Sequence, residues 1–137
     1  MSERLGFSSA MRVRLDRDFR RAYDLRVRRD LTFAMLLVAP NQLLHARLGI
    51  SISRRVGSAA CRNRIKRLLR EAFRLEQKMM TAGVDYIVQV RPHQPNTLEV
   101  YRAALLKHAA IAGDLALKAQ DRRRNHPTDD IGSLGGA

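Results

Sequence analysis

Residues 47–75 read RLGISISRRVGSAACRNRIKRLLREAFRL, and this stretch says more about the fold than any other part of the sequence. Leucine and isoleucine alternate with glycine and serine over 48–53, which is the pattern of a β-strand with one buried face. A Gly-Ser pair then interrupts the alternation, and serine is a preferred residue at helix N-termini. We therefore predict a strand over 43–53 and a helix from Ser58, its N-cap, to about Lys78.

The predicted helix has an apolar face and a cationic face. The apolar face comprises Cys61, Ile65, Leu68, Leu69, Ala72 and Phe73. The opposite face comprises Asn63, Arg67, Arg70 and Arg74, flanked by Arg62 and Lys66 on one side and by Arg64 on the other. Basic side chains four residues apart repel one another unless anions lie between them. An arginine fork matches pairs of phosphate oxygens, so the pattern favours a phosphate-binding surface over an ordinary solvated one.

Two other residues of this helix, Glu71 and Cys61, do not indicate a catalytic or reactive site. Glu71 is the only acid in 47–75, and it lies four residues after Arg67 and three before Arg74. A local ion pair therefore explains Glu71 better than catalysis does. Cys61 lies on the apolar face, where burial is the ordinary role of a cysteine.

The composition of the whole chain also points to a polyanionic partner. The 137 residues include 26 Lys and Arg against 13 Asp and Glu, a formal net charge of +13. Nucleic acid and an anionic membrane surface are the two candidates. No apolar run approaches the roughly 20 residues that span a bilayer, and we find no signal peptide. With a single cysteine the chain forms no internal disulfide and no cysteine-based zinc site, so we expect a reduced, cytoplasmic setting.

The remaining elements follow from the same kind of patterns. We predict a helix over Asp16–Leu25 with Asp16 as N-cap, a strand over 30–39 that forms a hairpin-like pair with 43–53, a strand over Val84–Val90, and a last helix from about 97 to 119. The order is helix, two or three strands, helix, strand, helix, which indicates an α+β sandwich of helices against one small sheet. We expect a flexible lead over 1–11, one domain over 12–119 and a disordered tail over 120–137.

The residues RNRIKRLLRE at 62–71, preceded by GISISRRVG at 49–57, resemble the signature of the bacterial ribonuclease P protein subunit. The resemblance extends over roughly 12–112. It implies a single-domain α-β-β-β-α-β-α fold that is ribosomal-protein-like, with about four strands. It also implies a left-handed β-α-β crossover, an exception to the usual right-handed rule.

The resemblance further implies a division of labour within a ribonucleoprotein. The RNA subunit performs the chemistry with bound Mg²⁺, cleaving precursor tRNA by hydrolysis to release the 5′ leader. The protein assists, and the resemblance assigns it no catalytic or metal-binding residue; whether the protein alone binds metal ions stays open. Its expected partners are therefore the catalytic RNA subunit and precursor tRNA, with no membrane and no obligate protein partner.

The same resemblance assigns two groups of site residues by matching positions. The group expected to bind the RNA subunit is Arg54, Arg55, Arg62, Asn63, Arg64, Lys66, Arg67 and Arg70. The group expected to line a cleft for the precursor leader is Arg12, Arg14, Phe19, Tyr23 and Phe33. The chain departs from the pattern at Leu36, where some members have a second aromatic residue, and at Arg54-Arg55, where Lys-Lys is common.

The leader cleft also has a physical rationale. Single-stranded RNA binds to basic grooves that contain aromatic side chains, each stacked base contributing about 1–3 kcal/mol. Arginines at 12, 14, 17 and 20 surround Phe19 and Tyr23 in the sequence. Because those two aromatics lie four apart on a short amphipathic helix, core packing is the alternative. Phe19 fits either role, and the hydroxyl of Tyr23 favours the cleft.

Two other functions compete with this interpretation. An RNA-scaffolding protein would use the same basic helix without affecting tRNA maturation. A protein-only nuclease needs clustered carboxylates or a histidine base. The four histidines, His45, His93, His108 and His126, have no ligand spacing, and Asp129-Asp130 falls in the expected tail. The sequence therefore disfavours autonomous catalysis.

Overall fold

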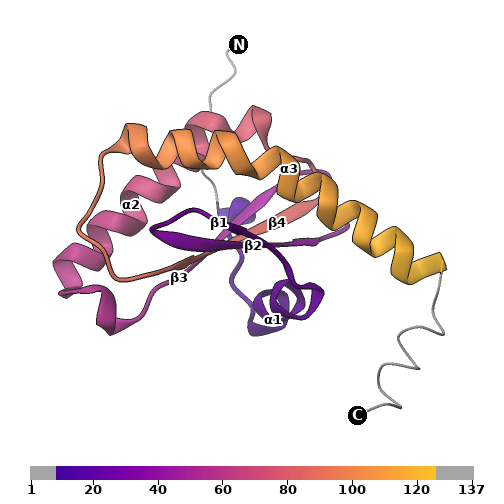
Figure 1. Ribbon diagram of the computed structural model, residues 1–137, viewed down its shortest axis with the longest axis horizontal. Coiled ribbons are helices and arrows are strands. Elements are labelled where there is room, and N and C mark those ends of the chain that lie inside the picture. Colours follow the sequence, from indigo (N-terminus) through magenta and orange to yellow (C-terminus); the bar gives the residue numbers. More distant parts are fainter. Residues whose placement is uncertain (1–8, 126–137) are drawn as a thin grey trace.

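The structure is a computed structural model that describes residues 9–125, and its elements follow the predicted order (Figure 1). The helices are α1 (Asp16–Leu25), α2 (Ala59–Glu76) and α3 (Leu98–Asn125), and the strands are β1 (Val27–Asp30), β2 (Ala34–Pro40), β3 (Arg47–Ser51) and β4 (Val84–Val90). Short 3₁₀ turns occupy η1 (Ser9–Met11), η2 (Arg54–Val56) and η3 (Gln77–Met79). The α+β class and the α-β-β-β-α-β-α order are confirmed.

The four strands form one mixed sheet in the order β1-β2-β4-β3. β2 pairs antiparallel with β1 and with β4, whereas β3 and β4 are parallel neighbours joined through α2. This is the expected β-α-β crossover, and its left-handed sense remains a prediction. The predicted hairpin between 30–39 and 43–53 is wrong, because β4 lies between those two strands. β2 and β4 are buried along almost their whole length, which suits central positions, whereas β3 is only partly buried and lies at an edge.

The predicted strand over 30–39 begins later than expected, at Ala34, because residues 31–33 form a turn. Thr32 has a φ of 76°, and its N–H donates to Oδ1 of Asp30 at 2.7 Å. Leu31 N–H donates to the carbonyl of Ala34 at 2.8 Å. These bonds form a tight turn, and the residues before it pair back onto β2 as the short strand β1.

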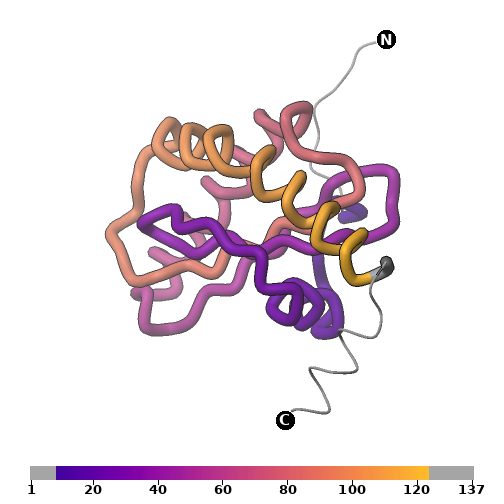
Figure 2. Tube along the Cα trace, turned by 45° about the vertical axis from the view of Figure 1, so that its right-hand side comes forward, coloured from indigo at the N-terminus to yellow at the C-terminus, as the bar shows by residue number. Residues whose placement is uncertain are grey.

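Helices cover the two faces of the sheet unequally. α1 lies on one face, and α2 and α3 lie on the other (Figures 1 and 2). The apolar stripe predicted for α2 is confirmed, since Ile65, Leu69, Ala72 and Phe73 are fully buried and Cys61 and Leu68 partly so. The side chain of Ser58 accepts a hydrogen bond from the N–H of Cys61 at 3.1 Å, so this residue is the predicted N-cap.

One helix cap and one helix end differ from the prediction. Asp16 is the first residue of α1 rather than its N-cap, a position held by Leu15. As part of the acidic first turn, Asp16 still interacts favourably with the helix dipole. α3 continues through 120–125, which we predicted to be disordered, because Gln and Arg are good helix formers. Arg123 also donates to the carbonyl of Asp24 at 3.2 Å.

The predicted lead and tail fall largely outside the described residues. Within 9–125, Ser9–Met11 forms a 3₁₀ turn, and Met11 packs against the core. Residues 1–8 and 126–137 lie beyond the described part of the chain. In the described part, no helix combines the length and the apolarity that crossing a membrane requires.

Candidate nucleic-acid interface

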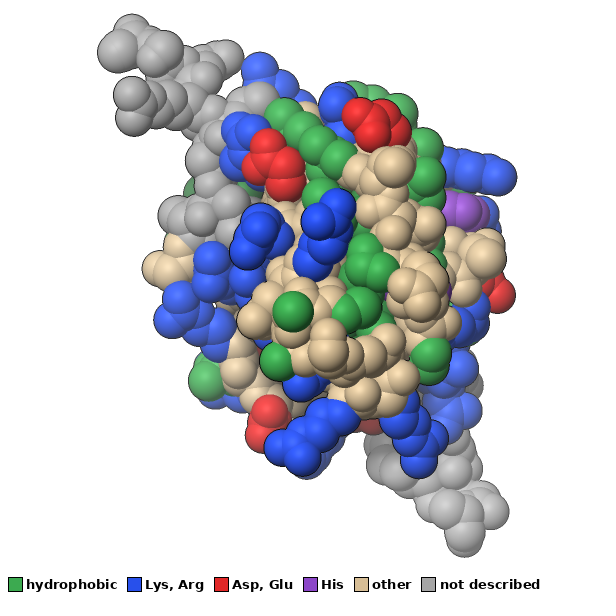
Figure 3. All heavy atoms as spheres, turned by 90° about the vertical axis from the view of Figure 1, so that its left-hand side faces the viewer, with side chains coloured by type: hydrophobic (Ala, Val, Ile, Leu, Met, Phe, Trp, Pro, Cys, Tyr) green, Lys and Arg blue, Asp and Glu red, His purple; other side chains and the backbone are tan. Residues whose placement is uncertain are grey.

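The outer surface of α2 forms a wide basic groove of about 650 Å³. Its lining residues are Arg12, Asn63, Lys66, Arg67, Leu68, Arg70 and Glu71. Four of these residues belong to the group predicted for the RNA subunit, and Arg12 comes from the group predicted for the leader. Figure 3, which views the α2 end of the molecule, shows Lys and Arg side chains spread over this face with few acids among them.

The one acid in the groove is already neutralised by a neighbour. Arg74 donates from Nε to Glu71 Oε1 at 2.9 Å, which confirms the local ion pair predicted for Glu71. This hydrogen bond lowers the pKa of Glu71 and keeps the carboxylate ionised. The other charged side chains that line the groove, Arg12, Lys66, Arg67 and Arg70, are all basic.

Arg70 connects this groove to the sheet. It also lines a second hollow of about 210 Å³ with Arg12, Val13, Arg14, Leu48 and Ile50. Burial, and then the charge of Arg12 nearby, lowers the pKa of Arg70. An anion bound between these two guanidinium groups would relieve their repulsion, so the junction between α2 and β3 suits a phosphate.

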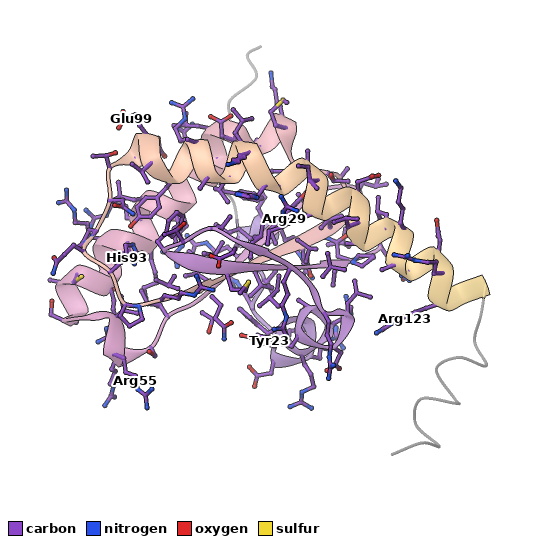
Figure 4. The ribbon with its side chains drawn as sticks, viewed as in Figure 1. Tyr23, Arg29, Arg55, His93, Glu99 and Arg123 are labelled. Carbon is purple, nitrogen blue, oxygen red and sulfur yellow. The ribbon has the colours of Figure 1, made fainter. Side chains whose placement is uncertain are left out.

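The other predicted α2 residues lie around the groove rather than in it. Arg54 and Arg55 are exposed on η2, before the helix begins, and Figure 4 shows Arg55 at the margin of the molecule. Arg62 is half-buried and donates from Nε to the carbonyl of Gly57 at 3.2 Å, which also holds the turn. Arg64 lies on the side of α2 that faces Tyr101 of α3. Burial raises the pKa of Tyr101, and the positive charge of Arg64 partly offsets this increase.

α1 holds the two predicted aromatic residues against the other sheet face. Phe19 and Tyr23 are half-buried beside the cluster of Val13, Ala22, Leu37, Ala39 and Ile87. The Phe19 ring lies over Gly49, where an added Cβ would stand 3.1 Å from Phe19 Cε1 and 2.7 Å from Ile87 Cδ1. Each aromatic therefore combines core contact with partial exposure.

Beside α1, one row of the sheet stays open. The paired residues Leu37, Ile87 and Gly49 are buried, with α1 packed on β2 and β4. In the next row, Gln89 is exposed, and its neighbours Met35 and Ser51 are half-buried. An accessible strip of sheet thus runs beside α1, with Phe19 packed over the adjacent row.

Phe33 does not belong to this cleft, and that prediction is corrected. Its side chain is 6% exposed and packs edge-on against Tyr101 of α3, with ring centroids 4.8 Å apart. The tight turn before β2 directs Phe33 into the core under α2 and α3. Leu36, where some family members have an aromatic residue, is also fully buried on that side.

An ion-pair network that sequence reasoning missed joins α1 to the sheet. Arg47 donates from Nε and Nη2 to the two carboxylate oxygens of Asp85, at 2.7 Å each, and lies 3.4 Å from Asp18 Oδ2. Both acids are buried, at 0% and 4% exposure. The hydrogen bonding that Arg47 donates to Asp85 raises the pKa of Arg47. Asp85 within the mostly apolar strand 84–90 was the available signal, because a buried carboxylate needs a cationic partner.

Arg17 and Arg20 also differ from their expected surroundings. The sequence places them around Phe19 and Tyr23, but they line a separate groove between α1 and the end of α3. Arg14 is exposed and stays near the β3 edge with Arg12. No three His, Cys, Asp or Glu side chains gather into a potential metal site within residues 9–125.

Taken together, the fold and this surface define a class: small α+β proteins with an arginine-rich helix inside a β-α-β crossover. Comparisons with known proteins give the family. A model of the Ribonuclease P family matches residues 7–111. The ribonuclease P protein component of Methylococcus capsulatus is 38% identical over 108 residues, covering 77% of this chain and 84% of that protein. The corresponding component of Chromobacterium violaceum is 38% identical over 86 residues, covering 62% and 70%.

The solved structures agree. The ribonuclease P protein of Thermotoga maritima aligns with a TM-score of 0.66 at 28% identity, covering 73% of this chain and 96% of that one. The chain therefore belongs to the ribonuclease P protein family. Membership makes it a protein component of a ribonucleoprotein nuclease that processes tRNA, with the ribonuclease P RNA as its partner.

Proposed function

We propose that this chain binds the catalytic RNA subunit through α2 and the 5′ leader of precursor tRNA through the cleft beside α1. In doing so it assists the Mg²⁺-dependent hydrolysis that releases the leader. The observation that supports this most strongly is the groove in which Arg12, Asn63, Lys66, Arg67 and Arg70 converge. A folded RNA presents closely spaced phosphates, and an arginine fork binds a pair of phosphate oxygens.

The α2 surface fits structured RNA because its charges are held by a rigid element. The apolar stripe fixes the helix to the sheet, so its basic side chains stand at fixed spacing on the opposite face. Arg54 and Arg55 extend the same surface beyond the helix start. Contacts of this kind position an RNA through its backbone rather than its bases.

The α1 cleft fits a single strand for different reasons. It offers Phe19 and Tyr23 as partly exposed rings beside an open, polar strip of sheet. Arg12 and Arg14 supply positive charge at the β3 end of that face. Aromatic platforms with basic neighbours bind unpaired nucleotides with little sequence preference.

The metal chemistry belongs to the RNA subunit in this proposal. The groups of this chain bind and orient RNA. A protein of net charge +13 between two polyanions reduces their repulsion and so favours Mg²⁺ binding at the RNA active centre. We place this complex in the cytoplasm.

Binding measurements on the reconstituted complex test the proposal. The protein is added to the RNA subunit, and dissociation constants are measured for precursor tRNA and for mature tRNA. We expect the protein to bind the RNA subunit and to tighten precursor binding more than mature binding. Tight RNA binding with equal effects on the two tRNAs would instead support an RNA-scaffolding role.

A further inference from the structure

A second basic groove lies on the other flank of α1, away from both surfaces described above. It measures about 410 Å³ and is bounded by α1, the end of β2 and the last turns of α3. Its lining residues are Arg17, Arg20, Arg21, Asp24, Leu25, Ala39, Pro40, Gln120 and Arg123. Four arginines thus face one acid over an apolar floor.

The charges in this groove are only partly neutralised within the protein. Arg21 lies 3.0 Å from Asp18 Oδ1 and also donates to the carbonyl of Pro40 at 3.4 Å. Within residues 9–125, by contrast, the structure gives Arg17, Arg20 and Arg123 no carboxylate partner. Since Arg17, Arg20 and Arg21 share one side of a helix, they repel one another until an anion binds.

The far wall of the groove lies outside the part of the chain that matches the family. That match ends at 111, whereas α3 continues to Asn125 and brings Gln120 and Arg123 over α1. The hydrogen bond from Arg123 to the carbonyl of Asp24 anchors this end of α3. The extension therefore converts one charged side of α1 into a two-walled groove.

We propose that this groove binds the phosphate backbone of precursor tRNA, as a third RNA-binding surface. The inference rests on the proposed function, because it assumes that the leader lies in the cleft on the opposite flank of α1. The helix is a shared wall: Phe19 and Tyr23 pack against the sheet beside the proposed leader cleft, and Arg21 and Leu25 line the groove.

Position favours precursor tRNA over the RNA subunit as the occupant. α2 and the end of α3 lie at opposite ends of the molecule (Figure 1). Figure 4 shows Tyr23 and Arg123 on the α1 side, with Arg55 at the other end. An RNA whose leader passes beside Tyr23 lies next to this groove, whereas an RNA held on α2 does not.

The test uses the full chain reconstituted with the RNA subunit. One variant combines Arg17→Gln and Arg20→Gln, a second carries Arg123→Gln, and a third carries all three substitutions. Lys118→Gln is the matched control, because this residue lies on α3, is exposed, and pairs with Asp114 outside the groove. Thermal unfolding checks that all variants fold.

We expect the three substitutions together to weaken precursor-tRNA binding about tenfold near 0.1 M salt. The slope of log K against log salt should fall by the amount expected for the loss of about two phosphate contacts. The affinity of these variants for the RNA subunit should not change. The control variant Lys118→Gln should bind precursor tRNA as the wild type does. Unchanged precursor binding would overturn the inference while leaving the proposed function intact, provided that Tyr23→Ala still impairs binding. An equal loss toward the RNA subunit would also overturn it, and a wild-type complex without preference for precursor would overturn both proposals.

Discussion

Arg47 and Arg67 belong to the same arginine-rich stretch, yet they lie in opposite surroundings. Arg67 is exposed in the groove on α2, whereas Arg47 is bound by two buried carboxylates. Composition and spacing identified the stretch as a binding region, but neither property separates the two residues. The separation depends on Asp18 and Asp85, which come from distant parts of the chain.

At Arg67 we predict a loss of electrostatic contact without loss of fold. Arg67→Gln should weaken binding to the RNA subunit and reduce the slope of log K against log salt by about one. Affinity is measured at several salt concentrations, with Arg67→Lys as the charge-retaining control. An unchanged slope for Arg67→Gln would remove this residue from the interface.

At Tyr23 we predict a loss specific to the leader. Tyr23→Ala should weaken precursor-tRNA binding by about fivefold to a hundredfold, the range expected from one lost stacking platform, and leave mature tRNA binding unchanged. Competition binding with the two RNAs measures both effects. Equal losses on precursor and mature tRNA would contradict the leader cleft.

At Arg47 the expected effect is on stability. Arg47→Met should lower the free energy of unfolding by about 3 kcal/mol, because it leaves Asp85 charged, fully buried and without its cation. Denaturant unfolding gives this difference. If the double variant with Asp85→Asn recovers none of the loss, the ion pair is not its cause.

At the scale of elements, local sequence patterns predicted where helices and strands lie in the chain but not which strands pair with each other. The strand over Val84–Val90 and the helix over Asp16–Leu25 have their predicted bounds, and Ser58 caps α2 as expected. The hairpin was wrong because adjacency in sequence does not reveal that β4 enters between β2 and β3. The resemblance had placed Phe33 in the leader cleft, but a turn rather than strand alternation sets the direction of its side chain.

The contact between β1 and α3 predicts a pH dependence. Arg29 donates from Nε to Nδ1 of His108 at 3.2 Å, and burial, followed by the charges of Arg29 and Lys107, lowers the pKa of His108. The unfolded chain therefore takes up this proton at a higher pH than the folded chain. Stability should fall as pH drops through about 6.5 and level off below the folded pKa.

Unfolding of wild type and His108→Gln between pH 5 and 8 measures this effect. The variant should lose the part of the pH dependence that lies just below pH 6.5. Identical pH profiles for the two proteins would show that His108 does not titrate differently in the folded state.

At the scale of the whole molecule, charge and sequence motif predicted the function better than the layout of its surfaces. A net charge of +13 indicated a polyanionic partner, and the motif in 49–71 indicated the family. The number of basic grooves was not predictable, because it depends on how α1, α2 and α3 meet around the sheet (Figure 2). Arg12 illustrates this, since it was predicted for the leader and lines the groove on α2.

In the proposed function this chain assists the catalytic RNA subunit and does not itself cleave precursor tRNA. Precursor-tRNA cleavage by the RNA subunit at low Mg²⁺, with and without the protein, tests it most directly. We predict strong stimulation by the protein and no cleavage by the protein alone. Cleavage without the RNA subunit, or tight RNA binding without any stimulation, would contradict it.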